Sequence, residues 1–493
     1  MSPCDDLAPG EREMTTRQVA LVDSAFEEGQ YESGIAMLED LCSPTVHPSK
    51  SHVRQLLYIA LYPPSHAPTT GNCHKTSQES PSKFSSRHAY STLLPSPTSS
   101  QLAKRTLRVL ADVNSPASLL RALPAYPDPT GADDAPPHYP ELPSDVDSFV
   151  ASEAVRFRNC KNCWNILKSG FISSLVDTSS AVPASPRKRT RGNATATKRD
   201  HLDEEASSLV VGENAWPVLD WLLVLFEKDE LMTEASRQRT RYSPLLLGQI
   251  PPTRSDSGSK WDANDPLEVV FHCFEQQDES RRAMGGRLLN LLVNLTSTNL
   301  FDLPLFMNLL IPRLPLGASE LRDLLFGLSS TWTLCKFKVA LCQRYLTRAC
   351  VGSGVSRGRG RPRAQPRPIT ARKSASKQGA TVPTTPHSKP EIAPLSSNQS
   401  QNTLLPAAEI LHLLTMKTDA SALSKTIKFD LLVTYGILQH QTPAEDKSRD
   451  WTEMLQSGHV EEAVRDIFGV SEGDQPSDNT SQRILLRLIA TWR

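Results

Sequence analysis

The segment NAWPVLDWLLVLFEKDEL, residues 214–231, lies in the densest apolar part of the chain, about residues 213–350. Its apolar side chains recur with a period near 3.6 residues, which predicts a helix. The apolar run from Trp216 to Phe226 contains Asp220 and is too short to cross a membrane. We therefore expect Trp216 and Trp221 to pack inside a helical domain rather than to stack on a ligand.

Five further segments of the same kind follow, each 10–20 residues long and separated from the next by Pro, Gly or Ser. Asp265, which precedes Pro266, and Ser319 are expected to cap helices. The series predicts an all-α fold with an irregular armadillo-like or α-solenoid helical body. Because no strict period repeats along it, a regular solenoid is not predicted. The five segments are DPLEVVFHCFEQQ, ESRRAMGGRLLNLLVNLTS, LPLFMNLLIPRL, ASELRDLLFGLSS and LCKFKVALCQRYLTRAC.

Helical segments alternate with segments rich in Pro, Ser, Thr or basic residues, which bury too little apolar surface to fold. The chain has 38 prolines among 493 residues, and 38% of its residues are hydrophobic, in keeping with such a mixture. The predicted order is N-terminal helices at 15–62, a disordered linker at 63–98, a helical segment with a Pro-rich loop at 99–175, a disordered basic linker at 176–208, a central helical domain at 209–350, a disordered linker at 351–402 and C-terminal helices at 403–493.

The 54 basic and 54 acidic residues balance, so only the local distribution of charge is informative. The first residues, MSPCDDLAPGEREMTT, lack the apolar stretch of a secretory signal, and no run of 18 apolar residues occurs. Nine irregularly spaced cysteines fit a reducing compartment better than a disulfide framework. These observations predict a soluble intracellular protein.

Two short junctions, Glu28–Gly34 (EGQYESG) and Gln456–Ala463 (QSGHVEEA), each place a glycine between two predicted helices. Both resemble the helix-turn-helix junction of a tetratricopeptide repeat, but the other positions of that repeat do not follow. Two generic αα-hairpins are therefore the favoured interpretation.

The arginine tract, which we define as residues 352–378, contains eight basic residues and no acidic residue. Its core, Arg357-Gly358-Arg359-Gly360-Arg361-Pro362-Arg363, resembles the AT-hook, a short peptide that binds the minor groove of DNA. Glycine lets the backbone approach the groove floor, and proline holds the chain extended. Arginines favour the narrow, strongly negative groove of A·T tracts.

The resemblance implies a role for each matching residue. Arg359 and Arg361 would enter the groove, and Gly360 and Pro362 would shape the backbone between and beside them. Phosphate contacts would come from five other basic residues of the tract, Arg357, Arg363, Arg367, Arg372 and Lys373. A single hook binds weakly and would act together with another contact. The partner favoured is A·T-rich DNA; an Arg-Gly segment that binds RNA and a plain solvated linker are the alternatives.

A second basic cluster lies at residues 187–199. Lys188-Arg189-Thr190-Arg191 fits the monopartite nuclear-import pattern, and an import receptor would accept it in an acidic groove. A generic charged loop is the alternative. Ser185 resembles a cyclin-dependent kinase site, and its phosphate would add roughly −1.5 to −2 charge and weaken import. The other basic residues of the cluster are Arg187, Lys198 and Arg199.

Cys160 and Cys163 form a lone C-x-x-C motif. Zinc would need two further ligands at suitable spacing, and a redox role would need a preceding strand. The surrounding sequence is instead typical of one helix at about 146–170, which favours buried structural cysteines. A second set, Cys335, Cys342 and Cys350, has the spacing of one helix face and is expected in the core.

The run Glu227–Glu230 (EKDE) is predicted to end a helix on a solvated face rather than to form a catalytic carboxylate set. Gly354–Gly358 matches G-x-S-x-G, but a nucleophile elbow needs a strand before it and a helix after it. No Walker loop, H-E-x-x-H or dinucleotide glycine pattern occurs. We therefore predict no catalytic residue, metal or cofactor.

These patterns together predict a nuclear, non-enzymatic scaffold or chromatin-associated subunit. Its helical body would bind other nuclear proteins, and its arginine tract would tether them to A·T-rich DNA, without a membrane partner. A cytoplasmic helical adaptor, or an RNA-associated protein whose basic linkers keep it soluble, is the alternative.

Overall fold

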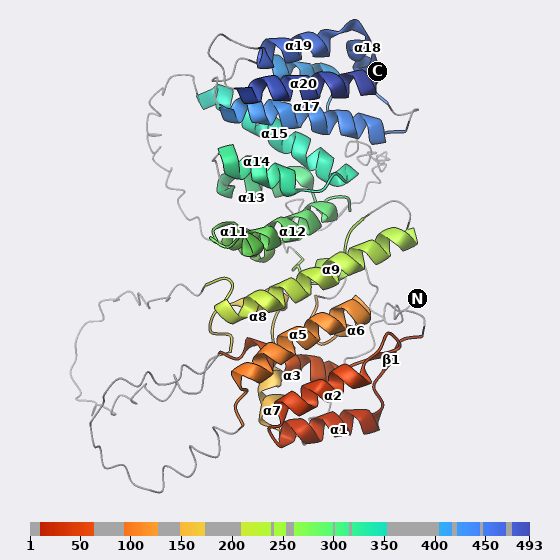
Figure 1. Ribbon diagram of the computed structural model, residues 1–493, viewed down its shortest axis with the longest axis vertical. Helices are drawn as coiled ribbons and strands as arrows, with labels where there is room; N and C mark the ends of the chain where they lie inside the picture. Colours follow the sequence, from red (N-terminus) through yellow and green to blue (C-terminus); the bar gives the residue numbers. More distant parts are fainter. Residues whose placement is uncertain are drawn as a thin grey trace, which may run out of the picture. The chain divides into compact units, whose positions relative to one another are not determined.

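The structure is a computed structural model, shown in Figure 1, and the fold is all-α. The chain divides into two compact units, unit 1 (Met1–Phe337) and unit 2 (Lys338–Arg493). The division falls within helix α15 (Trp332–Gly352). The structure describes residues 10–63, 93–126, 148–172, 209–237, 241–252, 261–298, 301–314, 318–352, 404–416, 422–443, 447–469 and 476–493.

The first part of unit 1 is a group of helices that also contains a short two-stranded sheet. The strands β1 (Arg12–Glu13) and β2 (Val46–His47) pair in parallel, with Arg12 opposite Val46. Helix α2 packs on α1 and α5, and α3 packs on α5 and α7. The helices are α1 (Thr16–Glu27), α2 (Tyr31–Leu41), α3 (Lys50–Leu61), α5 (Pro97–Val113), α6 (Pro116–Leu120), α7 (Phe149–Arg158) and α8 (Cys163–Leu167).

The rest of unit 1 continues this packing from helix to helix. Helix α9 contacts α5 and α6 of the first part and α12 of the second, and α12 also packs on α11 and α14. The elements are η2 (Glu213–Ala215), α9 (Trp216–Arg237), α10 (Pro244–Leu247), α11 (Asn264–Phe274), α12 (Glu279–Leu295), α13 (Leu303–Leu310), η3 (Ile311–Arg313), α14 (Ala318–Gly327) and the first residues of α15.

Helix α9 is the predicted helix of the apolar segment, and most of its side chains up to Glu230 are buried, whereas Leu231 and Met232 are 55% and 44% exposed. Trp216 and Trp221 are 5% and 1% exposed, and Phe226 is fully buried, so the prediction that the tryptophans pack in the core is confirmed. A helix that is apolar on several faces is stable only when neighbours cover those faces. Elements on several sides, among them α3, α5, α6, α8, α10 and α12, provide that cover.

Unit 2 is a smaller group of helices around α17. Helix α16 packs on α17, α18 and α19, and α20 packs on α17 and α19. Aromatic rings hold the centre, where Trp451 meets Tyr435 edge-on at 5.1 Å between ring centroids. The helices after α15 are α16 (Ala407–Thr415), α17 (Ala422–Gln441), α18 (Arg449–Ser457), α19 (His459–Phe468) and α20 (Pro476–Trp492).

Both junctions that resemble a tetratricopeptide repeat are αα-hairpins, as expected. Gly29 follows α1 with φ 72°, and Gly458 separates α18 from α19 with φ 85°. This left-handed backbone is favourable for glycine because it has no Cβ. In the first hairpin, Gly34 lies so close to Phe26 that an added Cβ would be 2.5 Å from the ring, so a small residue lets the two helices approach.

Three local predictions are wrong. The helix expected at about 146–170 is broken between Arg158 and Cys163, because the Asn162 side chain accepts a hydrogen bond from the backbone of Asn165 and starts α8. Asp265 does not cap α11, which begins at Asn264. Ser319 lies inside α14, which begins at Ala318.

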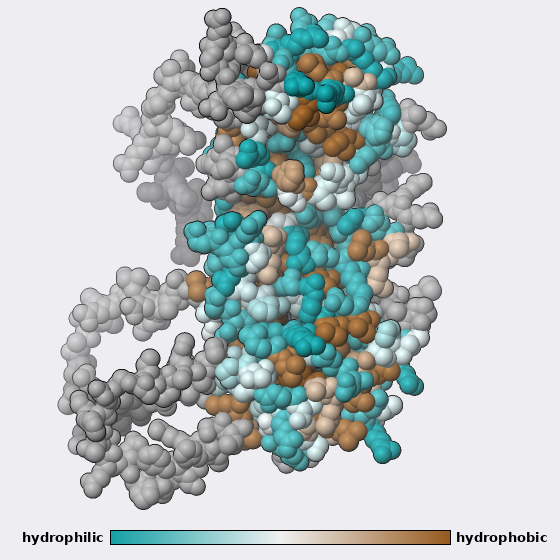
Figure 2. Space-filling model, in the orientation of Figure 1, coloured by the Kyte–Doolittle hydropathy of each residue, from teal (hydrophilic) through white to brown (hydrophobic). Residues whose placement is uncertain are grey.

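The described surface is mostly hydrophilic, with apolar residues distributed among polar ones on the face that Figure 2 shows. In the described part of the chain, every helix is too short or too polar to cross a membrane. The most exposed large apolar side chain described is Phe326 on α14, at 92%.

Two neighbouring glycines of α12 test the packing of unit 1. An added Cβ on Gly285 would lie 2.8 Å from Cys273 Cβ, whereas one on Gly286 would meet nothing within 4 Å. We expect Gly286→Ala to raise the free energy of unfolding by up to about 1 kcal/mol, because alanine favours the helix. Gly285→Ala is expected to lower it by roughly 1–3 kcal/mol through overpacking. Urea unfolding followed by circular dichroism measures both, and equal effects would contradict the packing of α11 on α12.

Candidate functional site

The residues predicted to bind DNA, to direct nuclear import and to accept a phosphate lie outside the residues that the structure describes. These predictions are therefore unchanged by the structure. They concern Arg357, Arg359, Gly360, Arg361, Pro362, Arg363 and Arg367 for DNA, Arg187, Lys188, Arg189, Arg191, Lys198 and Arg199 for import, and Ser185 for phosphorylation. Most of the three predicted linkers, 63–98, 176–208 and 351–402, lies there too.

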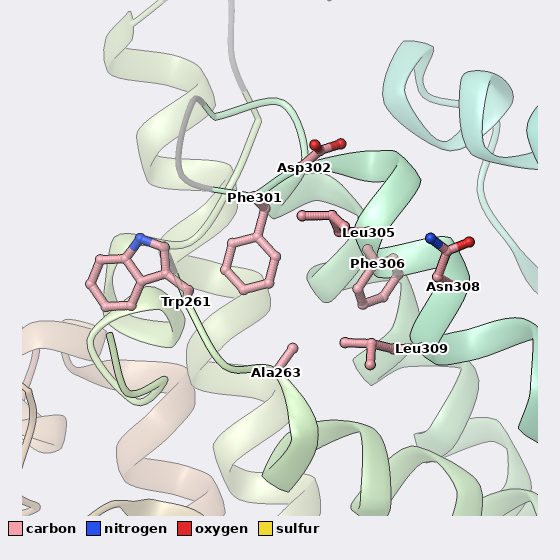
Figure 3. A pocket seen from close by; sticks show the side chains of 8 residues that line it. All are labelled: Trp261, Ala263, Phe301, Asp302, Leu305, Phe306, Asn308 and Leu309. Atoms are coloured by element: carbon pink, nitrogen blue, oxygen red, sulfur yellow. The ribbon is translucent and has the colours of Figure 1, made fainter. Parts of the chain in front are cut away.

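The candidate site within the described residues is an apolar hollow of unit 1, with a volume of about 220 Å³. It lies between residues 261–263 and helix α13, as Figure 3 shows. Six of the lining residues are apolar, and Asp302 and Asn308 are the polar ones. The full lining is Trp261, Ala263, Phe301, Asp302, Leu305, Phe306, Asn308 and Leu309.

One wall of the hollow is a short loop before α11. Trp261 forms an isolated antiparallel bridge with Pro252, and the backbone N–H of Asp262 donates to the Pro251 carbonyl at 2.9 Å. Trp261 and Ala263 are 4% and 2% exposed. The loop therefore holds a buried aromatic ring in a fixed position beside the hollow.

The other wall is one face of α13. Asp302, Leu305, Phe306 and Leu309 follow the i, i+3, i+4, i+7 spacing of residues that share a helix face. Phe306 is buried and its ring lies 6.4 Å from that of Phe337, so this side of the wall is fixed to the core. Leu309 is 45% exposed and forms part of the rim.

Asp302 places a carboxylate at the edge of the hollow, above Phe301 and Leu305 in Figure 3. It occupies the N-cap position of α13, but its side chain makes no capping hydrogen bond. It also has no ion pair with any described residue. The hollow thus combines an apolar interior with one negative charge that a ligand could neutralise.

No sequence motif pointed to this hollow. Its two walls are about 40 residues apart in the sequence, and only the fold brings them together. The available signal was the segment LPLFMNLLIPRL, whose leucines lie on more than one face of a helix. Such a pattern indicates a second apolar surface besides the one that packs on the core.

The run Glu227–Glu230 is neither a solvated helix end nor a catalytic set, so the prediction of a solvated face is wrong. Helix α9 continues to Arg237, and each of the four side chains binds a different group. Lys228 Nζ donates to the carbonyls of Ala111, Asp112 and Asn114, at distances of 2.7–3.0 Å. It therefore satisfies carbonyls at the C-terminus of α5, which lack helical partners.

The two central carboxylates of the run support other elements. Asp229 Oδ2 accepts hydrogen bonds from Ser243 Oγ at 2.6 Å and from the Leu245 backbone at 3.0 Å, at the start of α10. Glu230 is 3% exposed and accepts hydrogen bonds from Asn294 and Arg241. Burial raises the pKa of both carboxyl groups, and the hydrogen bonds partly offset this effect.

Arg287 of α12 completes a charged network across three helices. Its guanidinium donates to both Glu227 oxygens at 2.7 Å and to Asp220 at 2.5 Å. Asp220 also accepts a hydrogen bond from Arg108 of α5 at 2.7 Å. The hydrogen bonds that Arg287 donates to Glu227 and Asp220 raise its pKa above its usual value. These carboxylates are thus occupied by structural ion pairs.

The C-x-x-C cysteines do not form a reactive pair. Burial raises the pKa of the Cys160 thiol to about 11 and that of Cys163 well above its usual value, so both are protonated at neutral pH. Cys163 is fully buried, and Cys160 is partly exposed with its Sγ donating to the Arg156 carbonyl. Cys335 and Cys342 are buried as predicted, and the side chain of Cys350 lies outside the part that the structure describes. In the residues that the structure describes, no group of three His, Cys, Asp or Glu side chains is placed to hold a metal ion.

Comparison of the chain with protein-family models, with curated proteins and with solved structures gave no match.

The buried carboxyl of Asp229 predicts a pH dependence of stability. Because its folded-state pKa is raised above 3.8, the folded protein binds the proton more tightly than the unfolded chain does. This residue's contribution to stability therefore falls as pH rises from its unfolded pKa through its folded pKa. Asp229→Asn cannot ionise, so it removes this pH-dependent loss of stability, and its amide keeps an acceptor oxygen for Ser243 and Leu245.

We expect the free energy of unfolding of Asp229→Asn, relative to the natural chain, to be higher at pH 8 than at pH 4, measured by urea unfolding. Asp278→Asn is the matched control, because the pKa of this exposed carboxyl is lowered by hydrogen bonds from Ser280 and the trend should reverse. A pH-independent difference for Asp229→Asn would show that the carboxyl is ionised as readily in the folded protein as in the unfolded chain.

Proposed function

We propose that the protein is a nuclear, non-enzymatic scaffold that binds A·T-rich DNA through its arginine tract and protein partners through its helical units. The observation that carries the proposal is the acid-free sequence Arg357–Arg363 and the basic residues that follow it. Glycine, proline and arginine in this order suit a peptide that lies in a narrow minor groove.

The position of the tract in the chain supports this role. It begins at the end of α15, and the described chain resumes just before α16. Gln343 of α15 donates a hydrogen bond to Glu409 of α16 at 2.8 Å, so the helices on either side of the connection are bonded to each other within unit 2. A DNA-binding segment connected in this way is anchored to the protein at both ends.

The helical body supports the scaffold part of the proposal. Within unit 1, contacts run in succession from α2 to α5, from α5 to α9, from α9 to α12 and from α12 to α14. Successive contacts of this kind are typical of armadillo-like and other α-solenoid proteins, which present extended surfaces to partners. We propose that unit 1 is an irregular member of this architectural class.

The basic cluster at 187–199 supports a nuclear location, since a protein that binds chromosomal DNA needs a nuclear address. We propose that Lys188, Arg189 and Arg191 bind an import receptor and that phosphorylation of Ser185 weakens this binding.

The DNA-binding proposal is tested with the full-length protein and two duplexes of equal length, one A·T-rich and one G·C-rich, at several salt concentrations. We expect tighter binding to the A·T-rich duplex, with affinity falling as salt rises. Arg361→Ala should abolish the preference, because this side chain would lie in the groove.

Arg372→Ala is the matched control. It removes one proposed phosphate contact, so it should weaken binding to both duplexes alike and reduce the salt slope by about 1. Equal affinity of the natural chain for both duplexes would refute the AT-hook, and tighter binding to a single-stranded RNA of the same length would favour the RNA alternative.

The import proposal is tested by the location of a fluorescent fusion of the full chain. We expect the nuclear fraction to fall in the double variant Lys188→Ala/Arg189→Ala and in Ser185→Glu, and to stay high in Ser185→Ala. A fusion that stays in the cytoplasm without any substitution would contradict the nuclear proposal.

A further inference from the structure

We propose that the apolar hollow beside α13 binds a peptide segment of a partner protein that inserts one large apolar side chain and carries a Lys or Arg next to it. The basic residue would pair with Asp302. This inference rests on the proposed scaffold function and deepens it, because it names the site and the class of partner.

The size of the hollow suits one side chain. A buried cavity of about 150 Å³ lined by aliphatic and aromatic residues is large enough to bind benzene. The hollow, at about 220 Å³, therefore has room for one leucine, phenylalanine or tryptophan side chain. A buried aromatic or aliphatic anchor of this kind supplies much of the affinity at many protein interfaces.

Helix α13 has one more apolar face than the core of unit 1 uses. Met307 and Leu310 are 1% and 0% exposed and face the interior. Leu305 and Leu309 lie on the side of the hollow, and Leu309 is 45% exposed. A side chain inserted between Leu309 and the Trp261 ring would remove this apolar surface from water.

The charge at the rim selects the partner. The Asp302 carboxylate has no hydrogen bond or ion pair among the described residues, although it stands at the start of a helix that it could cap. Asp262, between the lining residues Trp261 and Ala263 in the sequence, adds a second negative charge near the same loop. Lys or Arg beside the anchor would meet complementary charge, and Asp or Glu would be repelled.

A peptide fits the hollow better than a small apolar ligand does. The rim residues Asn308 and Leu309 are both exposed, so an inserted side chain would leave them in contact with water. The backbone and neighbouring side chains of a peptide would cover this rim. At protein interfaces, contacts around an anchor side chain contribute little energy themselves but exclude water from the anchor.

The test is a selection of random 12-residue peptides displayed on phage against the full-length protein. We expect enriched peptides to share a Leu, Phe or Trp next to a Lys or Arg. The tightest is then synthesised with a fluorescent label, and its dissociation constant is measured by fluorescence anisotropy against variants of the full chain.

Leu309→Asp should raise the dissociation constant about tenfold or more, because it places a charge at the apolar rim. Asp302→Lys should invert the preference, so that a peptide with Glu in place of its basic residue binds better than the original. Phe326→Asp is the matched control: it also replaces an exposed apolar residue, outside the hollow, and should leave binding unchanged. Circular dichroism confirms that each variant is folded.

The proposal is overturned if no enriched peptide depends on Leu309, or if Asp302→Lys leaves the charge preference unaltered. Displacement of the labelled peptide by a small apolar molecule such as toluene, without any effect of Asp302→Lys, would instead indicate a small-molecule pocket. Binding of the A·T-rich duplex by the same variants is measured in parallel. Its persistence in Leu309→Asp separates a failure of the docking site from a failure of the DNA-binding proposal.

Discussion

The burial of α9 is the constraint on which unit 1 depends. A helix buried on most sides must pair its polar groups as well as cover its apolar ones, because an unpaired buried charge is far more costly than an exposed one. Successive residues of a helix point about 100° apart. Glu227, Lys228, Asp229 and Glu230 therefore reach four different directions, and each meets a partner there: Arg287, the C-terminus of α5, the start of α10, and Asn294 with Arg241. The four charged residues that follow the apolar run thus connect the neighbouring elements to α9.

The sequence predicted the helices from their apolar periodicity but not their partners. The run Trp216–Phe226 has the pattern of a buried helix, and it is one. The charged residues after it have the composition of a solvated helix end, and only the packing of α5, α10 and α12 around them shows otherwise. The break before Cys163 was missed for a related reason. The apolar pattern continues through it, while a single hydrogen bond that the Asn162 side chain accepts from the Asn165 backbone starts a new helix.

The two kinds of candidate site differ in how much the sequence can reveal. An extended peptide that binds DNA or an import receptor carries its recognition residues in one contiguous stretch, so Arg357–Arg363 and Lys188–Arg191 are readable without a fold. The hollow needs Trp261 and Leu309 to meet across nearly fifty residues, and neither stands out locally. The only signal in the sequence was that α13 has more apolar residues than one buried face requires.

These two kinds of site also suggest how weak contacts would combine. One hook and one peptide anchor would each bind with modest affinity when isolated, because each would cover a small surface. The Gln343–Glu409 hydrogen bond joins the helices that flank the segment containing the arginine tract. A partner with its own DNA contact would then meet the same duplex at a raised effective concentration. The overall affinity of the complex would then exceed that of either contact alone. This increase requires a peptide site and a DNA site in one chain rather than high affinity at either site.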